Sequence, residues 1–440
     1  MRARSAAALA ILAGLAALGP DRLRAGGAPH HPEAVDAATG GSSEAHGSAR
    51  ARRILRDVPL VDGHNDLPWR IRDKAGGRLD SLDIRNSRPE DSLHTDLVRL
   101  HAGGVGAQFW SVYVPVELQG PAAVVAVTEQ IDLVHRMTQR YPDVLELALT
   151  AADIRRIHRR GRVASLIGVE GGHCIDNQLA VLRQLYALGA RYMTLTHNKS
   201  TDWADACSDE PRHGGLAPFG VAVIREMNRL GMLVDLSHVS PETMHDALDA
   251  SAAPVIFSHS AAYAVTDHVR NVPDDVLRRL RQNGGVVMVC FVPRFVSRQV
   301  FAWDAEEAAE KARLEIRFPG HKTQVEKLLA EWRQRHPSPR ATVAQVADHI
   351  AHVVEVAGVD HVGVGSDFDG MPEPPAGLDD VSRFPALLDE LLRRGFSEAD
   401  VRKVVGLNVL RVMQEVESVA ARLQRQHGPA ELGLEVRGRR

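Results

Sequence analysis

Six short segments of the chain place an acidic residue or a histidine at the end of a strand-like run. These segments are residues 61–66, 168–173, 195–198, 234–238, 256–259 and 365–370. Because residues two apart in a strand face the same side, His64 and Asp66 can both reach one metal ion while Asn65 points away. The residue types and their spacing therefore predict a metal site.

The other acids and histidines of these segments predict a second metal ion. Ligands from separate strand ends can hold two divalent ions with a carboxylate between them, and Glu170 is the natural bridge. His238 and His259 are 21 residues apart, about one strand–helix–strand step, so they should stand on neighbouring strands and complete the second site. The segments contain no cysteine, and such nitrogen and oxygen ligands suit zinc, manganese or cobalt, with zinc as the first choice.

Eight strand-like runs carry these segments and alternate with helix-like stretches. The predicted strands are residues 59–66, 107–114, 163–170, 192–197, 233–237, 254–259, 285–291 and 361–367. Apolar residues at helical spacing predict helices at residues 122–140, 178–188, 217–230, 241–250 and 274–282. Continuous apolar strands, each followed by a helix, indicate a (β/α)8 TIM barrel, whose active site forms at the carboxyl ends of the strands.

Composition and charge exclude several classes of protein. The 440 residues fit one large barrel, and 44% hydrophobic with 5% aromatic residues is typical of a soluble core without a membrane span. A net charge of -3, with no basic cluster interleaved with aromatic residues, does not favour a nucleic-acid partner. The three cysteines are too scattered for a disulfide framework, although one bridge stays open.

The two ends of the chain differ from the barrel in composition. We predict a signal peptide at residues 1–25, a disordered linker at 26–50, the barrel domain at 51–420 and a charged tail at 421–440. Arg2 and Arg4 followed by the uncharged residues 5–18 are typical of a secretory signal, so we expect export to the periplasm or the exterior. The alternatives are an uncleaved anchor and a frayed Ala-rich extension. No cysteine lies near the signal to carry a lipid, and the tail lacks the apolar run of a glycolipid anchor signal.

One long departure from the barrel pattern covers about residues 292–340. Residues 304–317 and 322–335 read as charged helices on either side of a Phe-Pro-Gly breaker. We expect a helical insertion after the seventh strand, either packed beside the site or exposed without a catalytic part.

The order and spacing of these motifs closely resemble the membrane dipeptidase (renal dipeptidase) family of zinc peptidases, over about residues 58–413. Further stretches that resemble the family are residues 96–100, 106–113, 270–275 and 406–412. A single His-x-Asp is common, whereas the ordered set is highly specific. The cysteines of animal members are replaced here by Val116, Lys199, Thr266 and Arg298, which favours an exported enzyme without a membrane anchor.

The resemblance implies two zinc ions per chain that share Glu170. The other implied ligands are His64 and Asp66 for one ion, and His238 and His259 for the second. Asp62 and Asp235 lie in the same motifs; they fit the role of orienting an imidazole equally well, so we leave them out of the ligand set.

The resemblance also implies three residues that act on the substrate. His197 would face the scissile carbonyl, Arg270 would bind the substrate carboxylate, and Asp367 would sit beside the bridging water and move its proton. Asp367 as a third ligand or a helix cap is the alternative. The implied reaction is hydrolysis of a dipeptide by a metal-bridging hydroxide; the alternative is another amide, such as a β-lactam or a D-amino acid derivative, in the same site. Assembly as a homodimer stays an open alternative.

Overall fold

The computed structural model describes residues 48–85 and 91–431. The predicted signal peptide, almost all of the predicted linker and the end of the predicted tail lie outside these residues. Within them, the first helix begins at Ala49 and the last ends at Gln426, so helical structure extends past both predicted limits of the barrel domain. None of the helices in the described ranges is long and apolar enough to cross a membrane.

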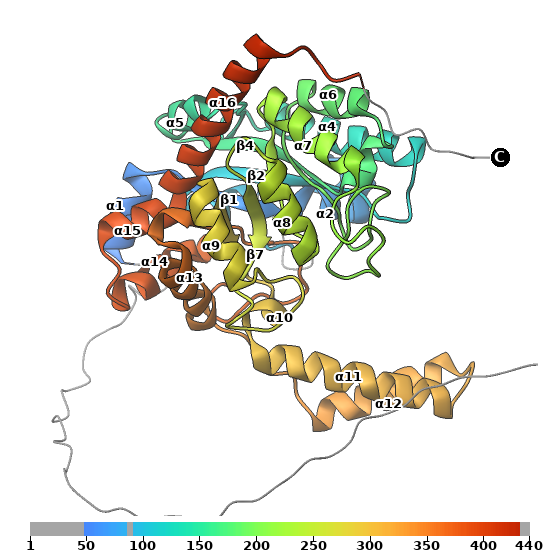
Figure 1. Cartoon of the computed structure of the whole chain (residues 1–440). Helices are drawn as coiled ribbons and strands as arrows, with labels where there is room; N and C mark the ends of the chain where they lie inside the picture. The colour runs from blue at the N-terminus through green and yellow to red at the C-terminus, as the bar shows by residue number, and fades with distance from the viewer. Residues whose placement is uncertain (1–47, 86–90, 432–440) are drawn as a thin grey trace, which may run out of the picture. The chain divides into compact units, whose positions relative to one another are not determined.

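A closed barrel of eight parallel strands forms the centre of the domain (Figure 1). Its strands are β1 (Leu60–Asn65), β2 (Val105–Tyr113), β4 (Val163–Glu170), β5 (Ala190–Thr194), β6 (Leu233–Asp235), β7 (Ile256–Ser260), β8 (Val286–Val289) and β9 (Val362–Val364). The barrel closes because β2 pairs with both β1 and β4, while β9 pairs with β1. The predicted (β/α)8 barrel is confirmed.

Helices surround the strands. Besides the helices of the insertion described below, they are α1 (Ala49–Asp57), α2 (Leu67–Ala75), α3 (Leu97–Ala102), α4 (Pro121–Arg140), α5 (Ala151–His158), α6 (Leu179–Ala187), α7 (Pro218–Leu230), α8 (Pro241–Ala250), α9 (Asp274–Asn283), α13 (Val343–Ala357), α14 (Phe384–Arg393), α15 (Glu398–Arg402) and α16 (Asn408–Gln426). Short 3-10 turns lie at Gly172–Ile175, Val359–His361 and Val381–Arg383, and a π-helical turn at Lys403–Leu407. Apolar residues pack both inside the barrel and between strands and helices, which explains the continuous apolar runs of the strands.

A ninth strand, β3 (Leu145–Leu147), was not predicted. It pairs with the first residues of β4, on the edge whose later residues pair with β5. Three residues are too short a run to show a strand period.

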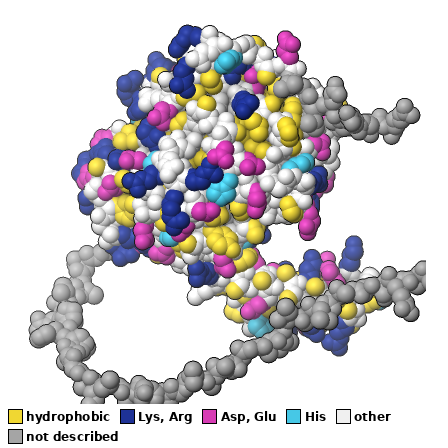
Figure 2. Space-filling model, viewed as in Figure 1, with side chains coloured by type: hydrophobic (Ala, Val, Ile, Leu, Met, Phe, Trp, Pro, Cys, Tyr) yellow, Lys and Arg dark blue, Asp and Glu magenta, His cyan; other side chains and the backbone are white. Residues whose placement is uncertain are grey.

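The predicted insertion follows β8 as α10 (Pro293–Val296), α11 (Arg298–Arg317) and α12 (Lys322–Arg335). Leu314 of α11 and Leu329 of α12 are buried in a small cluster of their own. Helix α11 begins earlier than predicted because the Ser297 side chain accepts the Val300 N–H and caps it. On the face shown in Figure 2, acidic and basic side chains are interspersed and no single basic area forms.

Candidate metal centre

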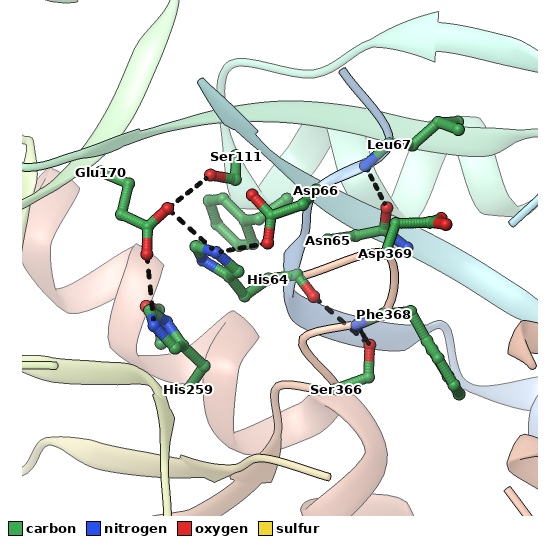
Figure 3. A network of polar contacts seen from close by, with 12 residues as sticks. His64, Asn65, Asp66, Leu67, Ser111, Glu170, His259, Ser366, Phe368 and Asp369 are labelled. Carbon is green, nitrogen blue, oxygen red and sulfur yellow. Dashed lines mark hydrogen bonds and ion pairs between the residues drawn. The ribbon is translucent and has the colours of Figure 1, made fainter. Parts of the chain in front are cut away.

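The Glu170 carboxylate, at the end of β4, lies between two groups of histidines at the carboxyl ends of the strands. Its Oε2 is 3.6 Å from His64 Nε2 and accepts a 3.1 Å hydrogen bond from the Ser111 hydroxyl. Its Oε1 is 3.1 Å from His238 Nε2 and 3.5 Å from His259 Nε2. Figure 3 shows the carboxylate with His64 and Ser111 at one oxygen and His259 at the other. Each oxygen therefore faces its own set of ligands.

His64 of β1 and Asp66, which follows the last residue of that strand, form the first set. His64 Nε2 is 3.4 Å from Asp66 Oδ2. His64 is fully buried, its Nδ1 is 2.8 Å from the Tyr192 hydroxyl, and its Nε2 has no hydrogen-bond partner among the described residues. A buried nitrogen without a partner, aimed between two carboxylates, fits a metal ligand.

His238 and His259 form the second set, with Nε2 atoms only 2.9 Å apart. Ser258 donates its hydroxyl proton to Asp235 Oδ2 over 2.5 Å, so its oxygen accepts from His259 Nδ1–H over 2.8 Å. This tautomer leaves the His259 Nε2 lone pair free to face the site. Burial lowers the pKa of both histidines well below the ordinary value, so they are neutral, the form that binds metal.

His197 and Asp367 lie at the edges of the same cluster. His197 Nε2 is 3.6 Å from Glu170 Oε1, and its ring centroid is 4.4 Å from that of His238. Asp367 groups with His64 and Asp66 within metal-ligand distances, and the groups that could hold an ion also include His197 beside Glu170 and His238. These distances fit a ligand role for either residue as well as contact with a substrate.

Glu170 and Asp367, two of the acids in the cluster, have opposite pKa shifts. Burial alone would raise the pKa of Glu170, but His64 and His197 outweigh it and hold that pKa well below its ordinary value. Burial raises the pKa of Asp367 well above its ordinary value, against His64 and with the help of Asp66 and Glu170. Glu170 is thus ionised, as a bridge between cations must be, whereas Asp367 is suited to carry a proton.

The loop that bears Asp367 has a strained backbone. Asp367 and Asp369 both adopt positive φ, 65° and 66°. Ser366 donates its N–H and its hydroxyl to the two carboxylate oxygens of Asp62, both over 2.7 Å. Asp62 therefore anchors this loop to β1, and it is not among the groups of described residues that could hold an ion.

A cavity of about 1120 Å³ opens from this cluster to the surface. Arg270 lines it from the loop between β7 and α9 and is only 5% exposed. Its guanidinium donates to Ser260 Oγ over 3.3 Å and to the His259 carbonyl over 3.2 Å. No carboxylate within the described ranges forms an ion pair with it, so a buried positive charge faces the cavity without a counter-ion.

Seven of the eight predicted site residues line one cavity, and the eighth, His64, is buried against Glu170 and Asp66. The residues that orient them were missed in part. Tyr192 reaches His64 through the barrel interior, and a methyl group on Gly168 would come 2.0 Å from the Tyr192 Cζ. Ser111 and Ser258 were missed as well. A buried polar residue in an apolar strand is the signal that marks all three, although it does not say which ligand each contacts.

Comparison with known proteins agrees with this geometry. The family model for membrane dipeptidases, peptidase family M19, matches residues 48–427. The dipeptidase verJ of Clonostachys rogersoniana is 45% identical over 388 residues, which are 86% of this chain and 89% of that protein.

Solved structures share the fold. The probable dipeptidase PvdM of Pseudomonas aeruginosa is 24% identical with a TM-score of 0.72, covering 84% of this chain and 98% of its own. A metallopeptidase from Rhodobacter sphaeroides, liganded with a phosphinate mimic of the dipeptide L-Ala-D-Ala, is 24% identical with a TM-score of 0.67, covering 82% and 99%. The chain belongs to the membrane dipeptidase family, peptidase family M19, a family of metal-dependent dipeptidases.

Proposed function

We propose that the chain hydrolyses dipeptides with two zinc ions held by the residues around Glu170. The observation that carries this proposal is the Glu170 carboxylate, whose two oxygens face His64 and the pair His238 and His259. Asp66 would complete the first site. Neutral imidazoles and carboxylates, without a thiolate, suit zinc. Two ions there would polarise the scissile carbonyl and lower the pKa of a shared water to about 7.

Three residues of the chain would act on the substrate itself. Arg270 would bind the C-terminal carboxylate, because its guanidinium is buried and lacks an acid partner within the described ranges. His197, beside Glu170 on the cavity wall, would orient the carbonyl of the scissile bond and stabilise charge on its oxygen. Asp367 would accept a proton from the attacking water and deliver it to the leaving amine.

This arrangement would limit the enzyme to short substrates. A longer peptide would place an uncharged amide where the dipeptide places its carboxylate, and Arg270 would stay unpaired. The size of the cavity, about 1120 Å³, supports a second candidate function with the same centre. Another amide, such as a β-lactam or a D-amino acid derivative, would also fit within it.

The experiment for Arg270 combines a protein change with a substrate change. Arg270→Lys keeps the charge but loses the two-pronged contact, so kcat/KM on a dipeptide should fall about tenfold or more with unchanged metal content. Amidating the dipeptide C-terminus should lower kcat/KM of the wild type by a similar factor. The same amidation should lower kcat/KM of the variant only slightly, because the two changes remove the same contact. If the two changes together lower kcat/KM by the product of their separate factors, Arg270 does not contact that carboxylate.

We also propose that the enzyme is exported, supported by Arg2, Arg4 and the uncharged residues 5–18. N-terminal sequencing of the native protein should find a start near residues 20–26. A Met1 start in the cytoplasmic fraction would contradict export.

A further inference from the structure

A second arginine lies beside Arg270 on the cavity wall. The Arg270 and Arg294 guanidinium carbons lie 5.3 Å and 5.5 Å from the centroid of the same Phe295 ring. The two carbons are therefore no further apart than the sum of these distances. Both arginines line the cavity that opens from the metal centre.

The groups around these arginines include a neutral histidine and one acid, Asp304. The His268 ring lies 4.4 Å from Phe295, and its Nδ1 accepts the Arg270 backbone N–H over 3.1 Å. Burial and then Arg294 lower the pKa of His268 to about 4, so this ring is neutral at pH 7. The positive charge of Arg294 acts to lower the pKa of Asp304 in α11, but the two side chains form no ion pair. Two positive charges thus share one end of the cavity, and neither forms an ion pair with an acid in the part of the chain that the structure describes.

A ligand with two carboxylates would complement this pair. The C-terminal carboxylate of a dipeptide is the proposed partner of Arg270, and the side chain of that same residue would then have Phe295 and Arg294 within its reach. In aspartate and glutamate, only two or three carbon atoms separate the two carboxylates. An acidic C-terminal residue therefore offers one carboxylate to each guanidinium.

We propose that Arg294 selects dipeptides with a C-terminal Asp or Glu by pairing with the carboxylate of that side chain. This inference rests on the proposed dipeptidase function and names the substrate class of the same site. Arg270 is buried and would hold the group common to all dipeptides. Arg294 is exposed, so its contribution is screened by solvent and salt and should change specificity rather than abolish turnover.

The test compares two substrates that differ only in charge, Ala-Glu and Ala-Gln, each with an L- and a D-configured C-terminal residue. The wild type should favour Ala-Glu, and Arg294→Gln should lower the ratio of the two kcat/KM values by about fivefold. Arg294→Glu should invert the preference towards Ala-Lys. Arg340→Gln is the matched control, because Arg340 lines the same cavity but already pairs with Asp379 and Glu373, and it should leave the ratio unchanged.

Raising the salt concentration should lower the wild-type ratio and leave that of Arg294→Gln nearly constant. A wild type that cleaves both dipeptides without preference, or a ratio that Arg294→Gln does not change, would overturn the role of Arg294 and leave the dipeptidase function intact. A wild type that cleaves neither dipeptide would instead refute the proposed function, so the two failures are distinguishable.

Discussion

Asp235 controls the proton on His259 through a single hydroxyl group. The carboxylate accepts the Ser258 hydroxyl over 2.5 Å, and the same oxygen of Ser258 lies 2.8 Å from His259 Nδ1. The other Asp235 oxygen accepts the backbone N–H groups of Ser237 and Ser258. Asp235, which is outside the proposed ligand set, thus determines which nitrogen of His259 is free to bind a metal ion.

Asp235→Asn should reverse this chain of hydrogen bonds. The amide oxygen would keep the two backbone N–H groups, so the amide nitrogen would donate to Ser258, whose hydroxyl would then donate to His259 Nδ1. The proton would move to His259 Nε2, and zinc affinity should fall by about 10- to 100-fold. Competition with a chromogenic chelator measures this. Ser258→Ala removes the hydroxyl without forcing the wrong tautomer, so it should lower zinc affinity less than Asp235→Asn does. A loss of affinity equal to or larger than that of Asp235→Asn would refute the explanation.

His94 and Asp369 exchange two hydrogen bonds that support the strained loop of Asp367. The backbone N–H of His94 donates to Asp369 Oδ1 over 2.8 Å, and the backbone N–H of Asp369 donates to the ring Nδ1 of His94 over 3.0 Å. His94→Ala removes the second bond, so Asp367 should be less well positioned and kcat should fall about tenfold or more.

His94→Asn is the matched control for this loop. Its side-chain oxygen replaces Nδ1 as the acceptor, while both variants lose the ring contact with Phe368. His94→Asn should therefore recover most of kcat at unchanged metal content. Equal kcat values for the two variants would show that the hydrogen bond does not position Asp367.

His349 makes folding sensitive to acid at a distance from the reaction. It is fully buried, its Nδ1 accepts the Ala262 N–H over 2.9 Å, and its Nε2 donates to the Val296 carbonyl over 3.2 Å. Burial lowers its pKa to about 4, below the value of about 6.5 in an unfolded chain, so the unfolded state binds the proton more readily.

The stability that depends on neutral His349 is fully present above about pH 6.5 and is lost as the pH falls towards 4, by about 3 kcal/mol at most. His349→Asn keeps an acceptor for Ala262 but does not titrate. Urea unfolding between pH 7 and 5 should therefore show a smaller loss of free energy of unfolding for the variant. Equal pH slopes for both proteins would contradict this account.

The sequence predicted the barrel from local pattern, whereas the residues assigned to the centre rested on strand-end spacing together with the family resemblance. Strand β4 was predicted with its observed limits, and Glu170 lies at its end as expected. Contacts between strands that are far apart in the sequence could not be predicted from local pattern. Tyr192 stands out only as a polar residue in an apolar strand, which does not identify its partner; the closed barrel brings it to His64, 128 residues away. The role of Arg294 likewise depends on Phe295, Arg270 and the cavity together.

The number of metal ions per chain, measured together with hydrolysis, tests the central claim most directly. Elemental analysis of the purified protein should find about two zinc ions per chain, and removing them with a chelator should abolish dipeptide hydrolysis, which added zinc restores. Glu170→Gln should lose both ions together, because one carboxylate faces both sets of ligands. Full hydrolysis by metal-free protein, or a Glu170→Gln variant that keeps both ions, would contradict the account.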